Sequence, residues 1–256
     1  MKRKQRLILV ASTSFMIILL TFLLPRYAQP LSYHDFADKR VFINIPNFFD
    51  VMSNIPIFVI GIIGYFCLNS CNLTTIPSEE KKLWKLFFFA SILTAIFSAY
   101  YHLKPDNLRL GLDRLALSFL FMSFFCVILE ERMHEKIGIK LLWPLIGLGI
   151  LSVIYWITSE KIGKGDLRFY GLIQFGPMLL LPLVFFLFPP CYTGQSYLYL
   201  SFIFYMLAKI AEVEDRKIFE YFHQQLSGHT LKHLLSSISL ICVIFYLRLK
   251  KRLTSA

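Results

Sequence analysis

Two short stretches that lie far apart in the sequence contain residue types that can bind a metal and activate water. The first, SAYYHLKPDNLRLGLD, contains Ser98, His102 and Asp113, and the second, SGHTLKHLL, contains His229 and His233. Residues four apart on a helix share a face, so His229 and His233 can bind one ion, as in zinc helices. Two histidines make a weak site, and His102 is the natural third ligand. Three histidines around Zn²⁺ leave a position open for water, which is typical of a catalytic site.

The remaining two residues have roles that suit such a site. Bound zinc lowers the pKa of water from about 15.7 to about 7 and polarises a carbonyl group. Asp113 could accept the proton of that water and pass it to a leaving group. Ser98 lies one helical turn before His102 and could donate to a developing oxyanion. A nucleophilic role for Ser98 competes with this one, but we favour the donor because zinc hydroxide needs no covalent step.

Each of these residues also has a simpler interpretation. A lone HxxxH pair is more often structural than metal-binding, and a single histidine at a membrane boundary is by default an interfacial residue. A single serine in an apolar helix is by default a packing contact. Their combined occurrence favours one site. The other three of the six histidines are weaker candidates because they lie in loops or at the ends of predicted helices: His34, His134 and His223.

The elements that must position these residues are apolar runs long enough to cross a membrane. Of the 256 residues, 56% are hydrophobic and 17% are charged, against about 25% charged in soluble domains. Runs of about 20 apolar residues recur along the chain. We predict an all-α, polytopic membrane helix bundle with eight spans at residues 7–24, 47–69, 82–102, 108–130, 139–158, 169–188, 196–211 and 229–247.

The predicted spans also give an orientation. The first follows the basic start MKRKQR and has no clear cleavage site after it, so we expect a retained signal anchor. Lys and Arg are more numerous in the loops on the side of the two termini, which predicts cytoplasmic termini and explains the net charge of +11 without a nucleic-acid partner. The five candidate site residues then fall near the outer face. Other polar residues join them there: Asp38, Arg40, Asn47, Asp50, Glu212 and Asp215.

The order and spacing of the five site residues resemble the signature of the alkaline ceramidase family. That family belongs to a wider superfamily of seven-span membrane hydrolases that includes the progestin/adiponectin receptors. The similar segments are IPNFFDVMSNIP (45–56), SAYYHLKPDNLRLGLDRL (98–115), AKIAEVEDRKIF (208–219) and SGHTLKHL (227–234). The resemblance implies a seven-span domain over residues 47–256, so the predicted signal anchor and outer loop over residues 1–46 are an addition before it.

The resemblance also implies an activity and a ligand set. It implies a zinc-dependent amidase that hydrolyses the N-acyl bond of ceramide, or of a similar N-acyl lipid, to a long-chain amine and a fatty acid. His102, His229 and His233 would bind zinc, Asp113 would act on the zinc water, and Ser98 would support the oxyanion. The lipid would enter from the bilayer, and no protein partner is implied. The short loops and this version of the motifs indicate a bacterial member in the inner membrane.

One segment departs from the family pattern. Eukaryotic members have an acidic calcium-binding segment before the first core helix, whereas this chain reads YHDFADKRVFINIPNFFD. We carry over no complete calcium site. Asp38, Asn47 and Asp50 could form a remnant of one, or Asp38 and Arg40 could pair and brace the zinc pocket. In the AKIAEVED stretch, we expect a shell of residues around the zinc ligands: Lys209, Glu212 and Asp215.

Two alternatives to an amidase stay open at this point. A non-enzymatic lipid receptor or sensor of the same fold would hold zinc as a structural element. A related hydrolase could act on an ester, because amide and ester hydrolysis both pass through a tetrahedral oxyanion.

Overall fold

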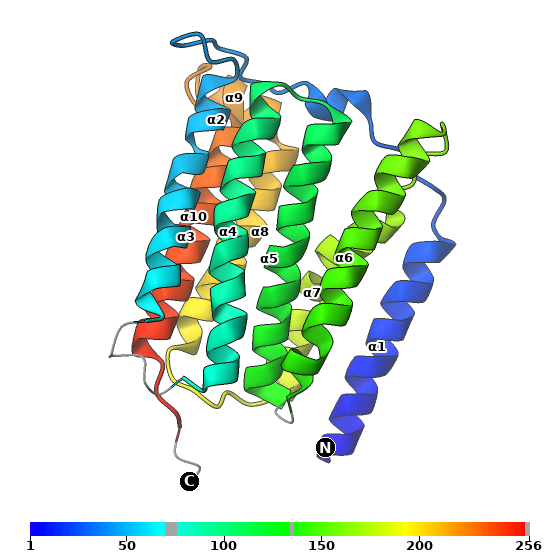
Figure 1. Cartoon of the computed structure of the whole chain (residues 1–256), viewed down its shortest axis with the longest axis vertical. Helices are drawn as coiled ribbons and strands as arrows, with labels where there is room; N and C mark the ends of the chain where they lie inside the picture. The colour runs from blue at the N-terminus through cyan, green and yellow to red at the C-terminus, as the bar shows by residue number, and fades with distance from the viewer. Residues whose placement is uncertain (70–75, 134–135, 254–256) are drawn as a thin grey trace. The chain divides into compact units, whose positions relative to one another are not determined.

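The computed structural model describes residues 1–69, 76–133 and 136–253, and within these ranges the chain is helical with no named strand. Figure 1 shows the helices with their labels. Their bounds are α1 Arg3–Leu23, α2 Phe48–Met52, α3 Asn54–Cys67, α4 Ser78–Leu103, α5 Asn107–Met133, α6 Ile137–Lys161, α7 Arg168–Leu187, α8 Gln195–Val213, α9 Asp215–Tyr221 and α10 Gly228–Leu249. A 3₁₀-helix covers Leu31–His34.

The all-α membrane architecture predicted from the sequence is confirmed. Eight helices of the described chain are long and apolar enough to cross a membrane, with α2 and α3 together forming one of them. These eight candidate spans correspond to the eight predicted ones, and their ends differ by a few residues. The protein is therefore an integral membrane protein by the length and composition of its helices. The short helix α9 was not predicted.

The described chain forms two compact units, and α4 and α5 each contribute residues to both. The first unit comprises Met1–Pro30, Pro77–Phe87 and Leu117–Cys191. In it, α7 packs against α1 and α6. The loop between α6 and α7 is fixed by Asp166, whose buried carboxylate accepts hydrogen bonds from the Arg168 guanidinium and from the Tyr155 hydroxyl.

The second unit comprises Leu31–Ile76, Phe88–Ala116 and Tyr192–Ala256, and it contains every candidate site residue. Its central helix is α10, which packs against α8 and α3. The Ser201 and Ser239 hydroxyls, 2.9 Å apart, join α8 to α10 by one of the interhelical hydrogen bonds common in membrane proteins. Helix α10 begins very close to the end of α8. A Cβ on Gly228 would lie 2.2 Å from the carbonyl oxygen of Ala211, so only glycine fits there.

Candidate metal centre

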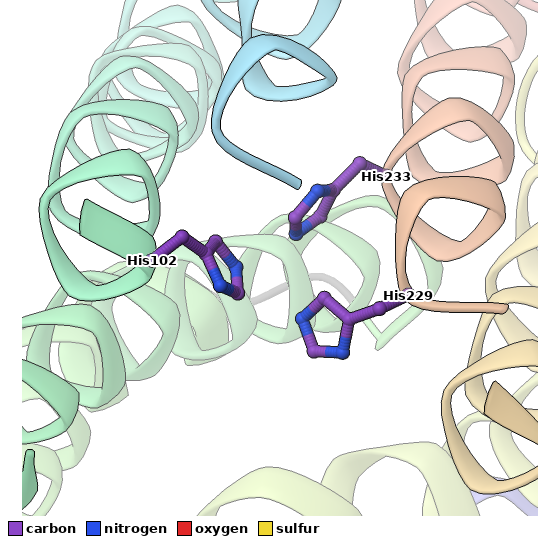
Figure 2. Close-up of side chains that lie close together, drawn as sticks. All are labelled: His102, His229 and His233. Atoms are coloured by element: carbon purple, nitrogen blue, oxygen red, sulfur yellow. The ribbon is translucent and has the colours of Figure 1, made fainter. Parts of the chain in front are cut away.

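Three histidines from two helices of the second unit converge on one point (Figure 2). His102 lies in the last turn of α4, and His229 and His233 lie in the first turns of α10. One ligand atom from each lies within 4.8 Å of those of the other two. The imidazole centroids are 4.7 Å (His102 to His229), 5.1 Å (His102 to His233) and 5.2 Å (His229 to His233) apart. The triad predicted from the sequence therefore comes together and could hold a metal ion.

The local sequence accounts for the position of each histidine. Helix α10 is capped by Ser227, whose hydroxyl accepts a hydrogen bond from the backbone N–H of Thr230. The helix therefore starts immediately before His229, and the i to i+4 spacing puts His233 on the same face. Helix α4 ends one residue after His102, and Pro105 follows two residues later. Because proline disfavours the helical conformation of the residue before it, the chain turns there.

The environment of His102 fits a metal ligand. Its side chain is fully buried, and neither ring nitrogen has a hydrogen-bond partner within the described part of the chain. A buried polar group without a partner is costly, and buried groups are nearly always satisfied. A metal ion would satisfy one of these nitrogens. Three imidazole nitrogens suit several divalent transition metals, zinc among them.

His233 is held in an orientation that leaves one nitrogen for a metal. The Ser53 hydroxyl oxygen lies 2.7 Å from Nδ1 of His233 and donates to the carbonyl oxygen of Asp50 at 3.1 Å. A hydroxyl has one proton, so if Ser53 donates to Asp50 it accepts from Nδ1–H of His233. The lone pair of His233 then lies on Nε2, which the Ser98 hydroxyl approaches at 3.4 Å. Ser98 therefore contacts the triad, as its predicted role requires.

His229 is surrounded by charged groups. Its backbone N–H donates to Asp215 at 2.8 Å, and its Nε2 lies 2.8 Å from the ammonium nitrogen of Lys232. The same ammonium lies 3.2 Å from the Glu212 carboxylate, which also pairs with Lys209. Of the three residues expected around the ligands, Asp215 therefore contacts His229 directly. Glu212 and Lys209 are joined to that imidazole only through Lys232.

The loop before α2 covers two of the three imidazoles. The Phe36 ring is buried, and its centroid lies 4.7 Å from that of His102 and 4.7 Å from that of His229. The backbone N–H of Ala37 donates to Asp215 at 2.9 Å, and Asp215 also accepts from the backbone of His229. One carboxylate thus joins the loop to the start of α10, and the Phe36 ring excludes water from one side of the triad.

The residues considered as a calcium remnant have other partners. Arg40 forms two hydrogen bonds with the Asp38 carboxylate, which raises the pKa of the guanidinium. Of the two alternatives for this segment, the structure therefore shows the Asp38–Arg40 pair. Asn47 donates to the backbone carbonyl of His102 at 2.8 Å. The Asp50 carboxylate accepts from the hydroxyls at the start of α10, Ser227 at 3.1 Å and Thr230 at 2.7 Å. Asn47 and Asp50 therefore contact the helix ends that carry the three histidines.

Asp113 and the remaining histidines lie outside the three-residue cluster. Asp113 is buried on α5, and its Oδ1 has no hydrogen-bond partner in the described part of the chain. His34 is 2.8 Å from the Tyr101 hydroxyl and 2.9 Å from the side-chain oxygen of Asn107. His223 is exposed, at the turn after α9. His134 lies outside the described residues.

Sequence reasoning missed three residues of the site. Ser53 lies in NFFDVMSN, a segment unusually polar for the entrance of a membrane helix, and that polarity was a usable signal. Lys232 lies between the paired histidines, and a charge inside a membrane span is itself a sign of function. Phe36 is one phenylalanine among 26, and nothing in the sequence distinguishes it.

No family model, no curated protein and no solved structure matches the chain. Any assignment of activity therefore depends on the site and on the motifs of the sequence.

Proposed function

We propose that the protein is a zinc-dependent membrane hydrolase that cleaves the N-acyl bond of ceramide or a similar N-acyl lipid. The observation that carries the proposal is the buried histidine triad inside a helical membrane protein, with both ring nitrogens of His102 unpaired in the described part of the chain. The resemblance of the surrounding motifs to those of alkaline ceramidases supports it. Burial of the triad suits a substrate that arrives from the lipid phase.

Each residue in and around the triad has a separate role in the proposed amide hydrolysis. Zinc held by His102, His229 and His233 would supply a water of lowered pKa and polarise the scissile carbonyl. Asp113 accepts a proton from the attacking water and returns it to the departing amine nitrogen. As the C–N bond breaks, the water oxygen becomes part of the fatty acid carboxylate. The Ser98 hydroxyl, whose oxygen lies 3.4 Å from Nε2 of His233, donates a hydrogen bond to the carbonyl oxygen as negative charge develops there.

The membrane placement follows from the same proposal. Both termini are cytoplasmic, the site lies near the outer face of a bacterial inner membrane, and the lipid enters laterally with its acyl chain among the apolar spans. Phe36, packed on two of the imidazoles, keeps bulk water from the reacting groups.

The test is hydrolysis of ceramide and of N-acylethanolamines by protein purified in detergent and reconstituted into lipid nanodiscs. The Asp113→Asn variant is expected to lose at least about a hundredfold in turnover, the usual scale for a general base. The His102→Ala variant is expected to lose most of its turnover, because only two of the three zinc ligands remain. His223→Asn, at an exposed turn outside the triad, is the matched control and is expected to keep full activity. Full hydrolysis by a folded His102→Ala variant would disprove the proposal.

A second candidate function is a lipid receptor or sensor that holds zinc as a structural element. The packing of Phe36 against two imidazoles favours it, because a covered metal has less access to a substrate. This candidate predicts saturable lipid binding without turnover, and binding by Asp113→Asn equal to that by the wild type.

A further inference from the structure

The segment of residues 31–40, between α1 and α2, covers a metal centre that is itself buried. All three imidazoles are buried, and the Phe36 ring of this segment lies 4.7 Å from the rings of both His102 and His229. A metal ion must come from water, because a charge is costly to place among apolar spans. The triad lies near the ends of α4 and α10, and residues 31–40 lie outside the candidate spans. An ion that enters at these helix ends has to pass Phe36.

His34 holds this segment against the turn that follows His102. Its Nδ1 lies 2.8 Å from the Tyr101 hydroxyl, and its Nε2 lies 2.9 Å from the side-chain oxygen of Asn107. A neutral imidazole satisfies both contacts, because it accepts a hydrogen bond at one nitrogen and donates one at the other. Tyr101 lies near the end of α4, and Asn107 is the first residue of α5. One side chain therefore joins the segment to both helices.

Weaker contacts join the same segment to α8 and α9. The Tyr33 hydroxyl donates to the Glu212 carboxylate of α8 at 3.1 Å. The Asp35 carboxylate pairs with Arg216 of α9, and this guanidinium also donates to the backbone carbonyl of Asp35 at 3.0 Å. Both side chains of the ion pair are exposed, and exposed pairs contribute little to stability. These contacts hold the chain next to Phe36, but breaking them costs little.

Few buried side chains fix the segment in place. Of residues 31–40, only Phe36 and Asp38 have buried side chains. Asp38 pairs with Arg40 of the same segment, so the two can move together. Local opening is easiest where a segment has few buried apolar contacts and many exposed hydrogen bonds. Opening would therefore displace a single buried apolar side chain, that of Phe36.

We propose that residues 31–40 form a lid that opens to admit a divalent metal ion to the triad and then closes over it. Phe36 closes the path, and His34 is the main contact that holds the lid shut. The Phe36 ring offers no ligand atom to the ion, so the lid sets how often the path is open. It therefore changes the rates of entry and exit by the same factor and leaves the affinity unchanged. The inference goes beyond the proposed hydrolysis, because it depends on metal binding by the triad and not on a lipid substrate.

The test follows Co²⁺ exchange by protein in lipid nanodiscs, through the visible absorption of the bound ion. The rate of uptake from a Co²⁺ solution and the rate of loss to excess EDTA are measured separately. In His34→Ala both rates are expected to rise together by about tenfold, as the removal of two hydrogen bonds of ordinary strength predicts, with an unchanged equilibrium affinity. Leu31→Ala is the matched control, because this side chain of the same segment is 80% exposed, and both rates are expected to stay at the wild-type values.

A reversible cross-link tests the opposite change. The double variant Asp35→Cys/Arg216→Cys puts thiols at the two exposed positions of the ion pair, and a bifunctional methanethiosulfonate reagent joins them. The cross-linked protein is expected to lose most of its rate of Co²⁺ uptake and release, and reduction of the cross-link is expected to restore both. The two single variants, treated with the same reagent, are the controls, since the chain contains five cysteines of its own.

The outcomes separate the lid from the proposed function. Unchanged Co²⁺ exchange in the cross-linked protein would overturn the lid, because the ion would then enter by another route. Faster loss without faster uptake in His34→Ala would also overturn it, and would assign His34 to the orientation of His102 through Tyr101. A wild type that binds no Co²⁺ would overturn the lid together with the metal centre. Parallel changes of both rates in a protein that hydrolyses no lipid would reject the hydrolase and keep the lid.

Discussion

The hydroxyl oxygen of Ser53 lies 2.7 Å from Nδ1 of His233, between that imidazole and the backbone carbonyl of Asp50. Ser53 occupies the break between α2 and α3, so the residue at which the helix is interrupted also contacts an imidazole of the candidate metal centre. Partners of this kind fix the tautomer of a ligating histidine and strengthen its binding to a metal.

Ser53→Ala is therefore expected to weaken zinc binding by about tenfold to about a hundredfold, the usual cost of losing such a partner. Competition with a chromophoric chelator measures the affinity. Ser236→Ala is the matched control, because the Ser236 hydroxyl donates to the backbone carbonyl of Lys232 within α10 and not to an imidazole. Equal zinc affinity in Ser53→Ala and the wild type would show that Ser53 does not position His233.

The triad is expected to hold about one zinc ion per chain, as in sites with three protein ligands. Elemental analysis of purified protein measures this zinc content. The double variant His229→Ala/His233→Ala is expected to contain none, because a single histidine does not retain the ion. His223→Asn keeps the wild-type content, since Asn tolerates the positive φ of 50° at this turn. Zinc absent from the wild type after reconstitution would contradict both the proposed function and the identity of the metal.

Gly228→Ala is expected to destabilise the start of α10. The added Cβ would lie 2.2 Å from the Ala211 carbonyl oxygen and 2.6 Å from Cα of Asp215, and both are backbone atoms that cannot rotate away. Overpacking of this kind costs about 1–3 kcal/mol. The thermal midpoint and the zinc content should both fall, since His229 is the next residue. Gly147→Ala, whose Cβ would meet nothing within 4 Å, is the control. An unchanged midpoint in Gly228→Ala would refute the close approach of α8 and α10.

Low pH is expected to reduce the stability that the Asp166 carboxylate contributes to the loop between α6 and α7. Hydrogen bonds from Arg168 hold the pKa of Asp166 well below its usual value near about 3.9. A lowered folded-state pKa means that the ionised carboxylate stabilises the protein fully above the unfolded pKa, and that this contribution is lost as the pH falls below it. Asp166→Asn should lower the thermal midpoint at pH 7, and its difference from the wild type should shrink below about pH 4.

The control for this pH dependence is Glu79→Gln, which removes an exposed pair with Lys82. Exposed pairs of this kind contribute about 0–1 kcal/mol, so little change is expected at either pH. A midpoint difference between Asp166→Asn and the wild type that stays constant down to acid pH would contradict the assignment.

Some features of the molecule could be read from the sequence because one physical constraint dominates each of them. The length of the apolar runs is set by the bilayer, so the eight spans could be predicted within a few residues. The spacing of His229 and His233 fixes their common face on any helix. His102 could be identified as the third ligand because the span count placed it on the same side as the pair.

Other features depend on how distant segments pack, which no local pattern contains. The break at Ser53 is followed by a helix of similar composition, so the apolar run predicts one span there and not two helices. Phe36 reaches the imidazoles because Asp215 fixes the backbone next to it, and that contact joins residues 178 positions apart.

The close approach of His102 on α4 and His229 on α10 has a consequence for how the protein is made. A nascent chain that has not yet reached α10 contains one ligand of the triad and cannot retain the ion. Under the proposed function, metal binding would therefore follow the synthesis and insertion of α10. The ion would then join two helices that enter the membrane at different times, and a cell short of metal would accumulate inserted chains whose α4 and α10 are not joined.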